Sequence, residues 1–154
     1  MCAGLIALTA LAGGFVAGLH AGLDYNTFPL MDGRIVPDGY MQLRPLLLNL
    51  VENNAAVQFD HRLLASLSLI ASLATVAMGW RSAARPVLLL LAGAVGLQYA
   101  LGIATLLAVV PPELATLHQA MAMLALIAAL VAVHMLRSPH AGRHTVVQQE
   151  VPAP

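Results

Sequence analysis

The 154-residue chain is 60% apolar and 9% charged, and its seven basic residues balance its seven acidic ones. Soluble globular domains carry about 25% charged residues, so the composition excludes an ordinary water-soluble domain. We expect membrane lipid around this chain and no nucleic-acid partner. The single cysteine, Cys2, excludes an internal disulfide.

Four apolar runs predict four membrane-spanning helices. A run of about 18 or more apolar residues is long enough to cross roughly 30 Å of hydrocarbon at about 1.5 Å per residue. We therefore predict an all-α fold, a membrane four-helix bundle, in residues 1–137, followed by a disordered inner tail in residues 138–154. The predicted spans cover residues 1–23, 55–80, 86–110 and 113–136.

The first span is predicted to be a retained helix. It has no basic residue before His20 and is too long for a cleaved signal peptide. Gly14, Gly18 and Gly22 are spaced by four residues, which places a glycine ridge on one helix face and favours close packing over chance. Because the sequence starts directly inside this span, we expect a fragment or a truncated gene product.

A long outer loop, residues 24–54, joins the first two spans. Its prolines and its two Asp-Gly pairs are turn formers, so a single continuous helix is not expected there. Its aromatic and apolar residues suit a lid at the membrane interface, and a plain connector with aromatic anchors is an equal alternative.

The arginines predict the orientation of the bundle. Arginines close to a short loop mark the cytoplasmic side, which places both termini in the cytoplasm and the long loop outside. The arginines on the predicted inner side are Arg81, Arg85, Arg137 and Arg143.

Four histidines lie inside the predicted spans, His20, His61, His118 and His134, and His61 and His118 are the strongest functional candidates among them. An ionisable residue in the membrane is a functional hypothesis because its burial is costly. His61 and His118 lie roughly 9 and 7.5 Å from the starts of the second and fourth spans, which run in the same direction. Both imidazoles are therefore expected in one layer near the outer face. A histidine pair on facing helices of a bundle is a standard way to hold a haem iron, whereas structural zinc needs four ligands.

Polar neighbours of the two histidines fit a haem pocket. Side chains at Gln58, Asp60, Arg62 and Gln119 are candidates to hold the imidazole N–H groups or the haem propionates. Gly102 either leaves room for a macrocycle or allows tight helix packing. A structural or transport protein, whose histidines make only hydrogen bonds, is the alternative that these residues leave open.

Several motifs together resemble the C-terminal half of haem A synthase. They are the string at residues 17–31, the Glu52-Asn53 pair, the block Gln58-Phe59-Asp60-His61-Arg62 and the block Thr116-Leu117-His118-Gln119. The resemblance covers nearly all of the chain up to about Arg137. Position 20 is histidine where many relatives carry an acidic or basic residue, and the loop lacks the cysteine pair of some branches.

The resemblance implies a specific reaction and cofactor. Members consist of two similar four-helix halves, each with a histidine pair, and oxidise the methyl group of haem O to the formyl group of haem A. By this likeness His61 and His118 are the axial ligands of haem b, and Arg62 and Gln119 contact the cofactor. No catalytic residue is expected in this half, because the substrate haem O sits in the N-terminal half.

These expectations define a haem A synthase-like oxidoreductase, catalytic only with the missing N-terminal half or with a second copy in an oligomer. A haem with two axial imidazoles has no open coordination position, so electron transfer is the role that the site supports. The alternative is a stand-alone cytochrome b-like electron-transfer membrane protein. The lack of a targeting segment favours the bacterial inner (cell) membrane.

Overall fold

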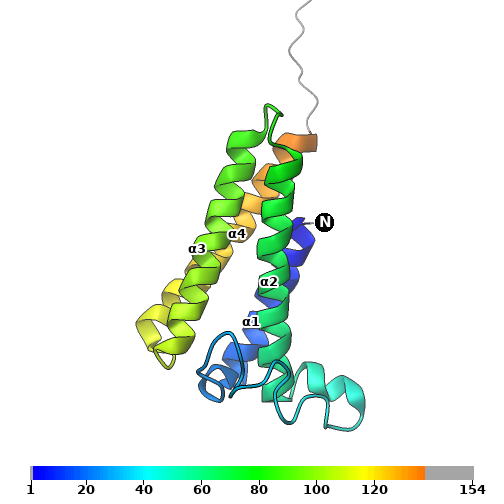
Figure 1. The fold of residues 1–154 in the computed structure, drawn as a ribbon, viewed down its shortest axis with the longest axis vertical. Coiled ribbons are helices and arrows are strands. Elements are labelled where there is room, and N and C mark those ends of the chain that lie inside the picture. The colour runs from blue at the N-terminus through cyan, green and yellow to red at the C-terminus, as the bar shows by residue number, and fades with distance from the viewer. Residues whose placement is uncertain (1, 138–154) are drawn as a thin grey trace, which may run out of the picture.

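The computed structural model describes residues 2–137, and these form an antiparallel bundle of four helices (Figure 1). The predicted all-α membrane four-helix bundle is confirmed, and the predicted tail, residues 138–154, lies outside the described residues. Two short 3₁₀ helices, η1 (Ala21–Leu23) and η2 (Leu46–Leu50), lie between the first two helices. The helices are α1 (Cys2–Gly18), α2 (Asn54–Met78), α3 (Arg85–Leu107) and α4 (Pro112–Arg137).

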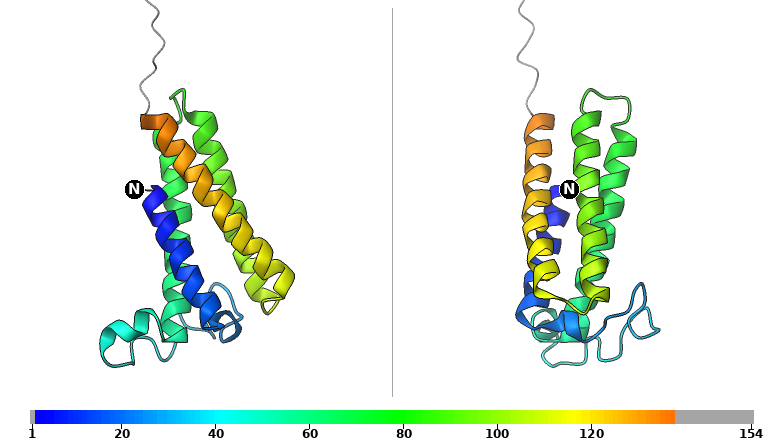
Figure 2. Two further views of the ribbon diagram at one scale, coloured as in Figure 1. Left: turned by 180° about the vertical axis from the view of Figure 1, so that it is seen from behind. Right: turned by 90° about the vertical axis from the view of Figure 1, so that its left-hand side faces the viewer.

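Each helix packs on two neighbours. Helix α1 contacts α2 and α4, and α3 contacts the same two helices, so α2 and α4 lie on one diagonal of the bundle. Figure 2 shows the bundle from two further directions, and in Figure 1 the α1/α2 hairpin and the α3/α4 hairpin diverge downward. We call this lower end, where residues 24–53 and the turn 108–111 lie, the loop end.

Three helices are long and apolar enough to cross a membrane: Asn54–Met78, Arg85–Leu107 and Pro112–Leu136. Helix α2 buries small and polar side chains, such as Ser68 and Ser72, and exposes large apolar ones, such as Leu67 and Ile70. Large apolar side chains on the outside suit lipid, and buried polar groups need partners inside the bundle. The chain is therefore an integral membrane protein.

Helix α1 ends earlier than the predicted span of residues 1–23. His20 has a left-handed backbone conformation (φ 54°), and the 3₁₀ turn η1 follows it, so the α-helix stops at Gly18 after 17 residues. The predicted glycine ridge is not used inside the described bundle. A Cβ atom added at Gly14 or Gly18 would have no other atom within 4 Å, and only Gly22 faces a neighbour, Val110.

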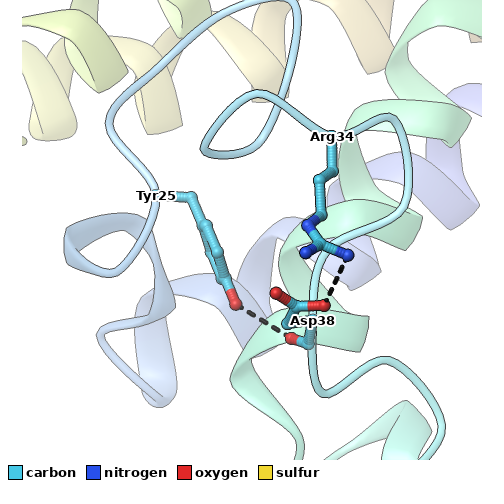
Figure 3. A network of polar contacts seen from close by, with 3 residues as sticks. All are labelled: Tyr25, Arg34 and Asp38. Carbon is cyan, nitrogen blue, oxygen red and sulfur yellow. Dashed lines mark hydrogen bonds and ion pairs between the residues drawn. The ribbon is translucent and has the colours of Figure 1, made fainter.

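Residues 24–53 fold against the loop end through hydrogen bonds. Figure 3 shows the Tyr25 hydroxyl donating to the Asp38 carbonyl at 3.0 Å and Arg34 paired with the Asp38 carboxylate at 3.0 Å. The Arg34–Asp38 ion pair is mostly exposed, so it contributes little to stability. The Asn53 side chain caps α2 by accepting from the Ala56 amide.

Asn49 is the buried centre of this loop, and its replacement by alanine is expected to destabilise the protein by about 1–3 kcal/mol. Its side-chain nitrogen donates to the carbonyl oxygens of Leu43 and Leu46. Its side-chain oxygen accepts from the Leu43 backbone N–H and from the Asn53 side chain. Alanine leaves these buried groups without partners. Thermal unfolding in detergent measures the change, and Asn54→Ala, which removes an exposed hydrogen bond, is the control. Equal melting temperatures for the two variants would contradict this assignment.

Candidate functional site

His61 is held between α2 and α1. Its Nδ1 atom lies 3.1 Å from the carbonyl oxygen of Thr9, and a carbonyl only accepts, so Nδ1 carries the proton. The other ring nitrogen, Nε2, is then left with its lone pair. The ring lies against Gly13, where an added Cβ atom would be 3.0 Å from Cε1 of the imidazole. An alanine at this point of α1 would therefore press on the imidazole, which would have to shift by a few tenths of an ångström.

His118 is held in a similar way between α4 and α3. A Cβ atom added at Gly102 would lie only 2.8 Å from Cε1 of the imidazole. The amide nitrogen of Gln98 donates to the His118 carbonyl at 3.0 Å and lies 3.5 Å from the ring atom Nε2. The ring atom Nδ1 of His118 and the Gln98 oxygen Oε1 are buried without a hydrogen-bond partner.

The two imidazoles share one layer of the bundle. His61 follows the first residue of α2 by seven positions and His118 follows the first residue of α4 by six, and both helices start at the loop end. The two rings lie on diagonally opposite helices, and each rests on a glycine of a helix between those two, His61 on Gly13 of α1 and His118 on Gly102 of α3.

The donor set fits a haem better than a bare metal ion. Among residues 2–137, no group of three or more His, Cys, Asp or Glu side chains could hold a metal ion. Zinc needs at least three protein ligands and calcium prefers six to eight oxygen ligands, whereas a haem iron brings four ring nitrogens and needs only axial ones. A metal-bound histidine usually donates its second N–H to a carbonyl, as His61 does to Thr9.

The polar residues predicted around the histidines make other contacts. Arg62 donates to the carbonyl oxygens of Thr27 and Tyr25, at 2.9 and 2.7 Å, and Gln58 donates to the same Tyr25 oxygen at 3.2 Å. These two side chains clamp the loop to α2. Gln119 lies on an exposed part of α4.

Asp60, the remaining member of this predicted set, binds the loop as well. It accepts a hydrogen bond from the Tyr40 hydroxyl at 3.2 Å. Burial raises the pKa of Tyr40, and the charge of Asp60 and this hydrogen bond raise it further, because each favours the neutral phenol.

Replacing Arg62 by lysine is expected to loosen the loop. Lysine keeps the charge but lacks the planar fork that reaches two carbonyls at once, and a charged hydrogen bond contributes about 1.5–3 kcal/mol. Limited proteolysis of the loop in detergent should become at least roughly tenfold faster, as that free-energy difference implies. Arg34→Lys, at the exposed ion pair, should leave the rate near that of the wild type. A clamp at Arg62 is refuted if both variants are cut at the same rate.

Sequence reasoning missed three of the residues that hold the imidazoles. Gln98 carried a signal, since it is a lone amide in an otherwise apolar span. Thr9 contributes a backbone carbonyl, which no side-chain pattern reveals. Gly13 stands beside another glycine, and only the packing of α1 on α2 decides which of the two meets His61.

The fold and the site define an integral membrane four-helix protein with a pair of opposed histidines. Residues 1–130 match the model of the COX15-CtaA family, described as cytochrome oxidase assembly protein, and the chain belongs to this family. The resemblance to haem A synthases expected from the sequence is thereby confirmed, and with it an oxidoreductase family.

Relatives with the name haem A synthase are similar over most of this chain. The haem A synthase of Granulibacter bethesdensis is 56% identical over 91% of this chain and 37% of its own length. The haem A synthase of Nitrosospira multiformis is 45% identical over 89% of this chain and 40% of its own length. Haem A synthase COX15 of Arabidopsis thaliana is 41% identical over 88% of this chain and 30% of its own length. The chain thus spans well under half the length of these relatives, and no solved structure matches it significantly.

Proposed function

We propose that this chain is the haem b-binding, C-terminal half of a haem A synthase, the membrane enzyme that oxidises the haem O methyl group to the haem A formyl group. The observation that carries the proposal is the pair His61 and His118, which lie in one layer of the bundle on diagonal helices, in a chain of this family. Haem b, when bound by both imidazoles, supplies one-electron transfer and has no open position for substrate.

The residues of this chain hold and orient the two ligands. The Thr9 carbonyl fixes the proton of His61 on Nδ1 and leaves the Nε2 lone pair, which would bind the haem iron; the same hydrogen bond makes the imidazole a better donor. Gln98 restrains His118 through its carbonyl. Gly13 and Gly102 leave the space that the two rings occupy.

Two other residues stay predicted cofactor contacts. Arg62 uses two of its five N–H groups on loop carbonyls, which leaves donors for a haem propionate. Gln119 follows His118 directly and has an exposed side chain, so its contact depends on what lies beside α4.

The complete reaction needs more than this chain. The relatives are over twice as long, which supports a missing N-terminal half, or a second copy of this chain, as the partner that binds haem O. We place the assembly in a bacterial inner membrane, with both termini in the cytoplasm and the loop end outside.

Reconstitution of haem A synthesis tests this function. The chain is expressed with a source of haem O, alone and together with an N-terminal half from a relative, and the extracted haems are separated by chromatography. We expect haem A only in the pairing with that half. Normal binding of haem b without haem A in any pairing would instead favour the stand-alone cytochrome b-like electron carrier.

A further inference from the structure

A cavity lies on the other side of α2 from His61. It has a volume of about 290 Å³ and is bounded by the loop, α2 and α3. At 100° per residue, Phe59, Leu63 and Ser66 share one face of α2, and His61 points to nearly the opposite face. The cavity is therefore separate from the histidine pair. Its lining includes Phe28, Ile35, Phe59, Arg62, Leu63 and Tyr99.

Aromatic rings form fixed walls of this cavity. Phe28 packs edge-on against Tyr99, with ring centroids 6.3 Å apart, and Phe59 packs edge-on against Tyr40 at 5.0 Å. Such contacts hold rings in place, and flat rings held in place favour a flat guest ring. Ligand pockets span about 300–1,000 Å³, so a cavity at the lower end of this range takes one ring and the start of a chain, not a tetrapyrrole.

The polar groups of the cavity select an oxygen acceptor. The Ser66 hydroxyl donates to the Arg62 carbonyl at 2.9 Å, so the Tyr99 hydroxyl must donate to Ser66, and both protons are used. The Arg62 guanidinium keeps unused N–H groups, and its Nε atom has no partner. These N–H groups can only donate, so they suit a guest that offers an acceptor such as a carbonyl oxygen.

The cavity continues into a surface that faces lipid. Leu63, at its edge, is 47% exposed, and Leu67 and Ile70 extend the same exposed apolar stripe along α2. An apolar chain attached to the bound ring has a path along this stripe and into the bilayer.

We propose that this cavity binds a membrane-dissolved ring that carries carbonyl oxygens and an apolar chain, the chemistry of a quinone. The ring lies among Phe28, Phe59 and Tyr99, and one carbonyl accepts from Arg62. This assignment does not depend on haem ligation by the histidines.

Binding of decylubiquinone to the full chain in phosphatidylcholine nanodiscs tests the proposal. Empty nanodiscs measure the quinone that simply partitions into lipid. We expect saturable binding of one quinone per chain above that background. Leu63→Trp fills the cavity and should weaken binding at least tenfold. Leu97→Trp places the same ring at an exposed site of α3 and should leave binding unchanged.

The haem spectrum of each variant separates this proposal from the proposed function. Leu63 and Leu97 are both exposed, so both variants should keep that spectrum. If Leu63→Trp does not fold, Ser66→Met narrows the cavity with a smaller change and decides the test. Three results would overturn the proposal: no saturable binding above empty nanodiscs, full affinity in the folded cavity variant, or displacement of the quinone by oleate as effective as by quinone itself. The last would show a general site for fatty chains.

Discussion

His61→Ala and His118→Ala are each expected to abolish the low-spin haem b spectrum of the purified protein. The imidazoles are the only predicted iron ligands, and each is held by a specific contact, His61 by Thr9 and His118 by Gln98. Loss of residues that merely support a metal ligand already costs about 10–100-fold in metal affinity, so loss of a ligand should cost at least that. Reduced-minus-oxidised spectra in detergent, normalised to protein, measure the haem content.

His134→Ala is the matched control for this pair. It also replaces a histidine of α4, but 16 residues beyond His118 and roughly 24 Å away along the helix. This variant should keep the haem spectrum. Unchanged bands in His61→Ala, or equal losses in all three variants, would rule out the assigned ligands and favour a protein whose histidines make only hydrogen bonds.

Gly102→Ala is expected to displace His118 and to reduce haem content severalfold. Alanine is normally better than glycine inside a helix by about 1 kcal/mol, so helix propensity alone predicts a stabler protein. Here the new methyl group would lie 2.8 Å from the imidazole Cε1 atom, closer than real contacts allow. A loss of haem content in Gly102→Ala would therefore arise from the contact of the new methyl group with the imidazole and not from helix propensity.

Other glycines of α3 and α1, the helices that contact the two imidazoles, offer controls for Gly102→Ala. Gly96→Ala on α3 and Gly14→Ala on α1 place methyl groups in open space, whereas Gly13→Ala places one 3.0 Å from the His61 ring. Haem content and melting temperature should be kept in the first two variants and lowered in Gly13→Ala, less than in Gly102→Ala. A Gly102→Ala variant with full haem content would show that the His118 ring does not need the space beside Gly102.

The sequence predicts the fold of this protein more completely than its site. Long apolar runs determine membrane helices because lipid leaves the backbone few alternatives, and three of the four predicted spans agree with the structure to within a few residues. The end of α1 was predicted too late, because the left-handed backbone at His20 breaks the helix within an apolar run. Hydropathy does not register such a backbone change.

Residues that act across helices were harder to predict. Arg62 and Gln58 lie in the motif that carries the family resemblance, but their contacts with the loop depend on how residues 24–53 fold back. The choice between a lid and a plain connector was open for the same reason. The structure shows a loop fastened to α2 by side chains of both elements, an arrangement that depends on long-range contacts.

The supports of each imidazole come from its own hairpin: Thr9 and Gly13 hold His61 within α1/α2, and Gln98 and Gly102 hold His118 within α3/α4. The hairpins diverge at this end (Figure 1). Under the proposed function, a haem can be bound by both imidazoles only when the two hairpins are docked in one bundle. By thermodynamic linkage, bound haem then stabilises the docked hairpins. At a free haem concentration of about one hundred times its dissociation constant, this stabilisation is about 2.7 kcal/mol. Haem shortage in the cell would thus weaken the docking of the two hairpins in this chain.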